Sequence, residues 1–105
     1  MGKEYFFCRL IFEGEYLNGK RNGKGKEYRL NSFFEVRLKF EGEYLDGKKN
    51  GKGKEYYFNG NLKFEGEYLN GEKNGKVKEY FSDGKINFEG EYLKGKRNGK
   101  GNILY

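Results

Sequence analysis

Apolar and polar residues alternate along four segments of the chain, the pattern of β-strands with one buried face. In the third segment the apolar phase runs through Leu62, Phe64, Gly66 and Tyr68, with charged residues between them. The second segment alternates without interruption over residues 34–44. The pattern therefore predicts four half-buried strands whose apolar sides share one core.

The string Phe-Glu-Gly-Glu-Tyr-Leu forms the centre of each segment and begins at Phe12, Phe40, Phe64 and Phe88. The starting positions lie 28, 24 and 24 residues apart. A recurring interval of this length is typical of stacked repeats, in which each unit contacts only its neighbours. We therefore interpret residues 1–105 as one repeat array, with a partial hairpin over residues 3–11 and repeats starting near residues 12, 40, 64 and 88.

A loop rich in glycine, asparagine and lysine follows each string, and a second strand follows each loop. The first loop opens with Asn18-Gly19, a pair that accepts positive φ and strongly favours a tight turn. The second strands begin with Lys-Glu-Tyr at Lys26, Lys54 and Lys78. One repeat is thus predicted to be one β-hairpin, and the chain to be all-β.

The interval between the first two repeats is four residues longer than the others, and Asn31-Ser32-Phe33-Phe34 replaces a tight turn there. The insertion is either a local protrusion or a pair of lengthened strands. The alternation from Phe34 onward favours lengthened strands, which would place Phe33 or Phe34 at an exposed edge. An exposed aromatic side chain there is either a candidate contact or a cover for the sheet.

Each apolar phase contains a glycine between two aromatic residues, where a strand would ordinarily lose packing. Its recurrence predicts that a ring from the neighbouring strand lies over the backbone. We interpret these as structural glycines: Gly14, Gly42, Gly66 and Gly90.

Composition argues against an enzyme. The chain has no histidine, which removes the usual general base and the commonest metal ligand. Its single cysteine, Cys8, cannot form an internal disulfide or a zinc site, and it favours a reducing compartment. Cys8 lies on the apolar phase of its strand, which predicts a small buried side chain. We expect no catalytic residue, metal or cofactor. The N-terminal residues lack the apolar stretch of a signal peptide, so we expect a cytoplasmic protein that is peripheral if it meets a membrane.

The segment Phe12 to Tyr16, with the loop over residues 18–25 and the three equivalent copies, resembles MORN (membrane occupation and recognition nexus) repeats. The second aromatic of the family motif, often tryptophan, is tyrosine in all four copies. Asparagine at Asn22 and its equivalents stands where the family often has histidine. The Lys-Glu-Tyr-Tyr second strand is similar to a bacterial variant found in antitoxin-like proteins.

The resemblance implies a single elongated, twisted antiparallel sheet of stacked hairpins, curved like a gutter, with aromatic residues lining one face. Members of the family are accessory modules in lipid kinases, junctional membrane proteins, a histone methyltransferase and cytoskeletal scaffolds. A lined aromatic face suits recognition of a protein partner or of a second copy, because tyrosine combines apolar area with a polar tip. The candidate interaction face comprises Phe12, Tyr16, Phe40, Tyr44, Phe64, Tyr68, Phe88 and Tyr92.

Most basic residues lie in or just after the first loop of each repeat, and the net charge is +6. Equivalent loops of a stacked array emerge on one side, which predicts a cationic edge. That edge either attracts anionic phospholipid or keeps the sheet soluble. Its residues are Lys20, Arg21, Lys24, Lys48, Lys49, Lys52, Lys73, Lys76, Lys96, Arg97 and Lys100. Nucleic acid is a less suitable partner, because the lysines lie in loops whereas most rings lie on the packed phase.

Paired carboxylates recur in every repeat, the first pair being Glu13 and Glu15. Glycoside hydrolysis needs two acids in unlike environments, whereas these pairs are equivalent. Cross-strand pairing with Lys26, Lys54 and Lys78 explains them better. The ends carry no polar capping unit, so we expect an end strand to pair with another strand, either from a partner or from a second copy.

Overall fold

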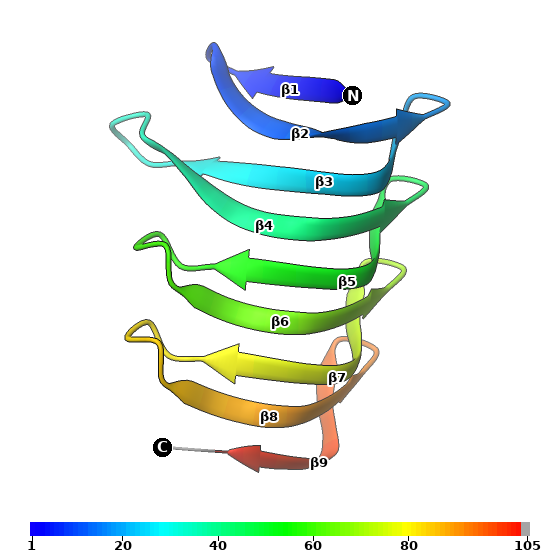
Figure 1. The fold of residues 1–105 in the computed structure, drawn as a ribbon, viewed down its shortest axis with the longest axis vertical. Coiled ribbons are helices and arrows are strands. Elements are labelled where there is room, and N and C mark those ends of the chain that lie inside the picture. Colours follow the sequence, from blue (N-terminus) through cyan, green and yellow to red (C-terminus); the bar gives the residue numbers. More distant parts are fainter. Residues whose placement is uncertain (104–105) are drawn as a thin grey trace.

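The computed structural model describes the backbone of residues 1–103 and the side chains of residues 1–98. Nine antiparallel strands form one open sheet in chain order, and this part of the chain contains no helix (Figure 1). The all-β prediction and the single sheet are confirmed. The strands are β1 (Gly2–Phe6), β2 (Arg9–Leu17), β3 (Lys20–Leu30), β4 (Val36–Leu45), β5 (Lys48–Tyr56), β6 (Leu62–Leu69), β7 (Glu72–Tyr80), β8 (Ile86–Leu93) and β9 (Lys96–Ile103).

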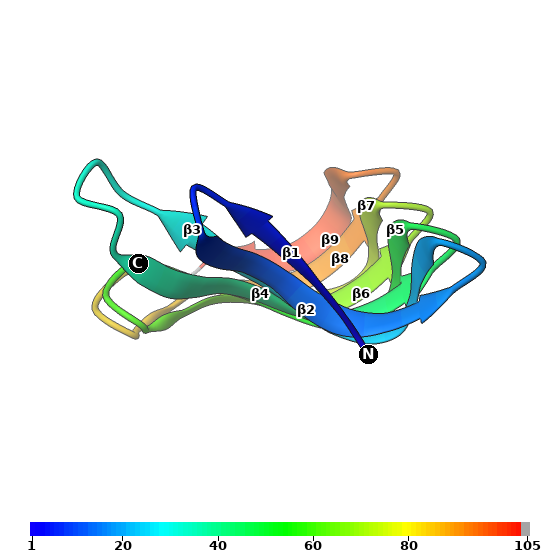
Figure 2. The same ribbon diagram turned by 90° about the horizontal axis from the view of Figure 1, so that it is seen from above.

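The sheet is a shallow gutter. Its extents are 41 × 33 × 16 Å, and the strands stack along the longest axis. Viewed along this axis, the strands bend so that both rims leave the plane of the sheet (Figure 2). One rim carries the turns at residues 18–19, 46–47, 70–71 and 94–95, called here the first-turn rim. The other, the second-turn rim, carries the turns at residues 7–8, 31–35, 57–61 and 81–85.

A β-bulge interrupts the alternation in every repeat. Glu27 lies opposite Phe40 while Tyr28 lies opposite Leu38, so β4 contributes one extra residue at Lys39. Equivalent shifts occur in the β1–β2, β5–β6 and β7–β8 pairs. Because a bulge resets the side-chain alternation, Leu38 and Phe40 point to opposite faces. The predicted uninterrupted apolar face over residues 34–44 is therefore wrong.

Phenylalanine and tyrosine form the core on one side of the sheet, called here the aromatic face. Phe12, Phe40 and Phe64 are completely buried. Tyr16 and Phe12 pack edge to face with their ring centroids 5.9 Å apart, and Tyr44 from the next repeat packs on Phe12 in the same way at 5.5 Å. Phe12, Phe40 and Phe64 thus each contact a tyrosine of their own strand and one of the following repeat, and Phe88 contacts Tyr92 of its own strand. This edge-to-face chain joins neighbouring repeats into one core.

Glycine makes room for this core. A Cβ at Gly14 would lie 2.7 Å from the Cα of Gly25 on the opposite strand and 2.9 Å from Cζ of Phe12. The ring over the backbone therefore belongs to the same strand, not to the neighbouring strand as predicted. Gly42 has the same surroundings, and Gly66 meets the side chain of Val77 instead. Gly90 occupies the equivalent register position, also opposite Val77.

The irregular N-terminal end differs in part from expectation. β3 and β4 contain 11 and 10 residues, which confirms the lengthened strands, and Phe33 and Phe34 lie exposed in the turn between them. Cys8 is exposed in the β1–β2 turn with φ 61°, so the prediction of a buried thiol is wrong. The turn occupies residues 7–8 and β2 begins only at Arg9, so Cys8 lies outside the strand whose apolar phase was expected to bury it.

We expect Gly42→Val to lower the free energy of unfolding by about 3 kcal/mol, because its side chain would overlap the backbone of Gly53 and Lys52 on β5. Chemical denaturation measures the change. Lys54→Val is the matched control, since this residue neighbours Gly53 but is exposed on the other face; its effect should stay within about 0.5 kcal/mol. Equal midpoints for the two variants would contradict the close-approach role of the glycine.

Candidate functional site

A cation covers each buried phenylalanine on the aromatic face. The guanidinium of Arg21 lies 3.8 Å from the ring centroid of Phe12. The ammonium of Lys49 lies 4.0 Å from the ring centroid of Phe40. Lys73 and Arg97 repeat the arrangement over Phe64 and Phe88, each at 4.2 Å. The cations come from the strand after each ring, so cation–π attraction joins the two strands of every hairpin.

Glutamates complete the cover. The Tyr44 hydroxyl donates to Glu27, and Lys49 lies 3.9 Å from the same carboxylate. Tyr16, Tyr68 and Tyr92 donate to the equivalent residues Glu4, Glu55 and Glu79. Burial, followed by the bond to Glu27, raises the pKa of Tyr44 well above its ordinary value. The hydroxyl stays protonated, and the aromatic face is a closed, hydrogen-bonded layer.

The predicted aromatic interaction face is therefore not open to a partner. Phe12, Phe40 and Phe64 have no exposed area, Phe88 has 4%, and Tyr44 and Tyr68 have 5% and 6%. Only Tyr16 and Tyr92 are partly exposed. The rings pack against one another and lie beneath cations, because a single sheet has no second layer to bury them.

The opposite side of the sheet, called here the charged face, carries two rows of alternating acidic and basic residues. The antiparallel register sets Glu13 opposite Lys26, and Lys26 opposite Glu41. The inner row comprises Glu13, Lys26, Glu41, Lys54, Glu65, Lys78 and Glu89. The outer row comprises Glu15, Lys24, Glu43, Lys52, Glu67, Lys76 and Glu91. The predicted cross-strand pairing is confirmed in register, and Lys78 and Glu89 approach to 3.5 Å.

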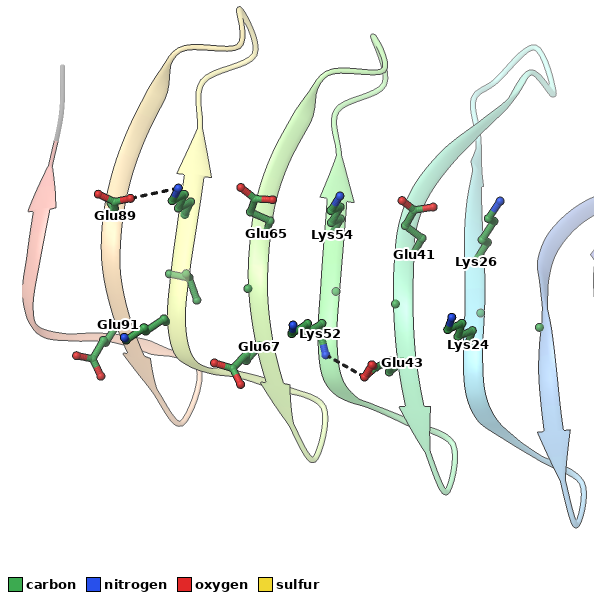
Figure 3. Close-up of a pocket in the computed structure, with 18 of the residues that line it drawn as sticks. Lys24, Lys26, Glu41, Glu43, Lys52, Lys54, Glu65, Glu67, Glu89 and Glu91 are labelled. Carbon is green, nitrogen blue, oxygen red and sulfur yellow. Dashed lines mark hydrogen bonds and ion pairs between the residues drawn. The ribbon is translucent and has the colours of Figure 1, made fainter.

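A groove of about 1030 Å³ runs between the two rows, across the strands (Figure 3). Its floor is the backbone of one residue per strand: Gly14, Gly25, Gly42, Gly53, Gly66, Val77 and Gly90. Their Cβ positions belong to the aromatic face, so the floor bears no side chains. Six lysines and seven glutamates form the walls. The groove is thus nearly neutral, although the whole chain carries +6.

Tyrosines of the second strands brace the inner row. The hydroxyls of Tyr28, Tyr56 and Tyr80 donate to Glu13, Glu41 and Glu65 at 3.0, 2.8 and 2.6 Å. Burial and the adjacent carboxylate raise the pKa of Tyr56 and that of Tyr80 to about 12. These bonds hold the glutamates in fixed orientations, which preorganises one wall of the groove.

The predicted cationic edge is divided among three places. Arg21, Lys49, Lys73 and Arg97 cover the phenylalanines on the aromatic face. Lys24, Lys52 and Lys76 stand in the outer row of the groove. Lys20, Lys48 and Lys96 remain exposed on the first-turn rim. In the third repeat the equivalent residue is Glu72. The side chain of Lys100 lies outside the described residues. The alternation within β3, β5, β7 and β9 sends neighbouring cations to opposite faces, so no single edge forms.

The residues that the structure describes contain no group of three histidine, cysteine or carboxylate side chains arranged to hold a metal ion. No helix in residues 1–103 has the length and apolarity needed to cross a membrane. Within each row, the carboxylates of the groove occupy equivalent positions in successive repeats.

A family model for the MORN repeat matches residues 12–29, 40–62, 64–86 and 88–105. The chain belongs to the MORN-repeat family. These repeats are generally associated with scaffolds for protein or membrane interaction, and the module is typically non-catalytic. The curated proteins contain no match to this sequence.

The groove is the feature that sequence reasoning missed. Glu13 and Lys26 were recognised as a cross-strand pair, but the two rows could be joined across all repeats only once the register was known. A usable signal was present: the second strands of the first three repeats place glycine or valine between two lysines, directly opposite the glycine between two glutamates.

We expect alkaline pH to weaken the fold through Tyr56. Its folded pKa of about 12 exceeds the ordinary value of 10.0, so its contribution is intact below pH 10.0 and is lost as the pH rises through about 12. Denaturation at increasing pH, with tyrosinate absorbance, measures this loss. Tyr56→Phe should cost about 1 kcal/mol near neutral pH and make the alkaline decline shallower. Glu41→Gln, which removes the carboxylate, should lower the pKa of Tyr56. Identical alkaline profiles for wild type and Tyr56→Phe would contradict the assignment.

Proposed function

We propose that this MORN-repeat protein is a non-enzymatic scaffold that binds a polypeptide segment in the groove of its charged face. The observation that supports the proposal is the alternation of lysine and glutamate along both walls over a floor without side chains. Such a floor lets a partner backbone approach closely. We place this binding in the cytoplasm, where a lone exposed thiol such as Cys8 stays reduced.

The balance of charge favours a polypeptide over a polyanion. A nucleic acid strand lying along the groove would meet seven glutamates as well as six lysines. Nucleic-acid affinity rests on neutralising phosphates with cations, so the alternating walls would repel as often as they attract. A protein segment can place acidic and basic side chains in turn and can match both signs.

The spacing of the walls defines the partner further. Adjacent strands lie about 4.8 Å apart, so a charge of the same sign recurs about every 9.6 Å along each row. An extended polypeptide rises about 3.1 Å per residue in the polyproline II conformation, so side chains three residues apart match this repeat. The groove base is one residue wide, which suits an extended segment better than a helix about 10 Å across. The expected partner carries opposite charges in alternation along an extended stretch.

The test is site-specific crosslinking in the cells that make the protein. A photoreactive residue at position 52 or 76 projects into the groove, whereas position 83 lies exposed in a turn of the second-turn rim. We expect the same partner protein to be captured from positions 52 and 76 and not from position 83. Lys52→Glu with Lys76→Glu should reduce its binding roughly tenfold, because like charges would then adjoin in the outer row. Equal capture from position 83, or none from the groove, would exclude the groove as the binding surface.

Anionic phospholipid is the second candidate ligand, and a row of leucines favours it. Leu17, Leu45, Leu69 and Leu93 are each at least 50% exposed at the ends of the first strands. Lys20, Lys48 and Lys96 lie opposite three of them across the turns. Apolar side chains beside lysines suit the boundary between headgroups and acyl chains. The first-turn rim would then be the membrane contact.

Vesicle sedimentation tests this candidate. At low salt we expect vesicles containing anionic lipid to retain the wild type, and Lys20→Glu with Lys48→Glu and Lys96→Glu to release it. Neutral vesicles provide the control for apolar adsorption. Retention that is equally weak before and after the substitutions would show that the rim is only a solvated edge.

A further inference from the structure

Two of the four turns on the second-turn rim, β1–β2 and β3–β4, lack the glycine that the β5–β6 and β7–β8 turns contain. In the β5–β6 and β7–β8 turns, Gly60 and Gly84 take the left-handed conformation, with φ 92° and 93°. Each donates its N–H to the carbonyl three residues earlier, at 2.9 Å. The β3–β4 turn makes the same bond at 3.0 Å from Phe34 to Asn31, and Phe34 has φ 58°. A phenylalanine thus occupies a position that the chain elsewhere gives to glycine.

The β1–β2 turn also lacks a glycine, and there Cys8 occupies the second position of the turn. Phe7 and Cys8 have φ 48° and 61°, whereas the tight turns of the first-turn rim all place glycine second, as in Asn18-Gly19. Left-handed backbone is unfavourable for bulky residues, and it persists where the surroundings or a function requires it. Burial provides no compensation, because Phe7 is 70% exposed and Phe34 is 44% exposed.

The exposed rings of Phe6, Phe7 and Phe34 lie together at these two turns, and with Phe33 of the β3–β4 turn they are called here the aromatic tip. Ring centroids of Phe6 and Phe7 are 4.4 Å apart, and those of Phe7 and Phe34 are 5.8 Å apart. Phe33 is 82% exposed, and the Oδ1 of Asn31 accepts its N–H and thereby fixes the turn. The β1–β2 and β3–β4 turns rise to the same side of the sheet, whereas the β5–β6 and β7–β8 turns bend to the other side (Figure 2). The tip can therefore meet a flat surface without obstruction from the later turns.

Two exposed arginines lie on the strands next to the aromatic tip. Arg9 is exposed opposite Phe6, and Arg37 lies on β4 directly opposite Arg29 of β3, whose guanidinium instead donates to the carbonyl oxygen of Tyr56 at 3.2 Å. Like charges directly opposite each other disfavour pairing unless an anion lies between or beside them. Glu35, at 3.2 Å from Arg37, is the acidic partner found there. The aromatic tip is thus accompanied by two exposed guanidinium groups, those of Arg9 and Arg37, against the single carboxylate of Glu35. Guanidinium groups bind phosphate in a bidentate manner.

We propose that the aromatic tip is a membrane-contact site, in which Phe7, Phe33 and Phe34 enter the interfacial layer of an anionic bilayer while the adjacent arginines bind lipid phosphates. The local charge is complementary to such a surface and would repel the same tip of a second copy. The site is independent of the groove, and it shares only its ligand chemistry with the first-turn rim.

The key variant is Phe33→Ser with Phe34→Gly, in the otherwise intact chain. Glycine at position 34 reproduces the turn chemistry of Gly60 and Gly84, so we expect the denaturation midpoint to stay constant or rise. Binding to phosphatidylcholine vesicles containing phosphatidylserine should fall at least about tenfold, since two inserting rings are lost. Arg9→Gln with Arg37→Gln should weaken binding to these vesicles and leave any weak binding to phosphatidylcholine alone unchanged.

Two controls locate the contact. Phe81→Ser changes an exposed phenylalanine in the β7–β8 turn, on the side away from the tip, and should keep full binding. Lys20→Gln with Lys48→Gln and Lys96→Gln neutralises the first-turn rim and should also keep full binding.

The proposal would be overturned by loss of binding in the rim variant alone, by unchanged binding in the tip variant, or by no binding of the wild type to anionic vesicles. Sedimentation equilibrium gives the remaining outcome: a wild-type oligomer that the tip variant converts to a monomer would assign the surface to a second copy instead. Because none of these variants alters the groove, failure here leaves the crosslinking experiment unaffected.

Discussion

The close approach of two backbones beneath a phenylalanine ring is the constraint on which the rest of the structure depends. At Gly14 and Gly25 the opposing strands come so near that a Cβ at the first would lie 2.7 Å from the Cα of the second. The ring of Phe12 covers both residues and excludes water from the aromatic face. The same side-chain-free row is the floor of the groove on the charged face. One packing requirement therefore creates both the core and the candidate binding surface.

A single-layer sheet must also cover its core without a second layer of secondary structure. Here Arg21 and its equivalents lie over the rings, while glutamates hold both the cations and the tyrosine hydroxyls. These cations therefore stabilise the fold and are not free for a ligand. The charge available for recognition differs accordingly between surfaces: it is balanced in the groove and positive around the aromatic tip.

The repeat, the hairpins and the single sheet could be predicted from the sequence, because the recurring string at Phe12 and its copies specifies strand, turn and period together. The bulge at Lys39 could not, since an inserted residue is compatible with an unbroken alternation of residue types. The exposure of Cys8 also depends on where the β1–β2 turn falls, which the apolar phase alone does not fix. The division of the basic residues between faces could not be predicted either, because most residues of the predicted loops belong to strands β3, β5, β7 and β9. Alternation within these strands sends neighbouring basic residues to opposite faces.

The regular and irregular parts of the array therefore differ in what they can recognise. Identical repeats present identical surfaces, so the groove can select a partner by charge period and length but not by a unique local feature. The aromatic tip occurs once, at the place where the period is broken and glycine is absent from two turns. The left-handed backbone of Phe34, for which the later turns use glycine, is retained although this side chain stays 44% exposed. Selection for stability alone would favour glycine at position 34, so Phe34 and the exposed rings beside it are best explained by a contact outside the sheet.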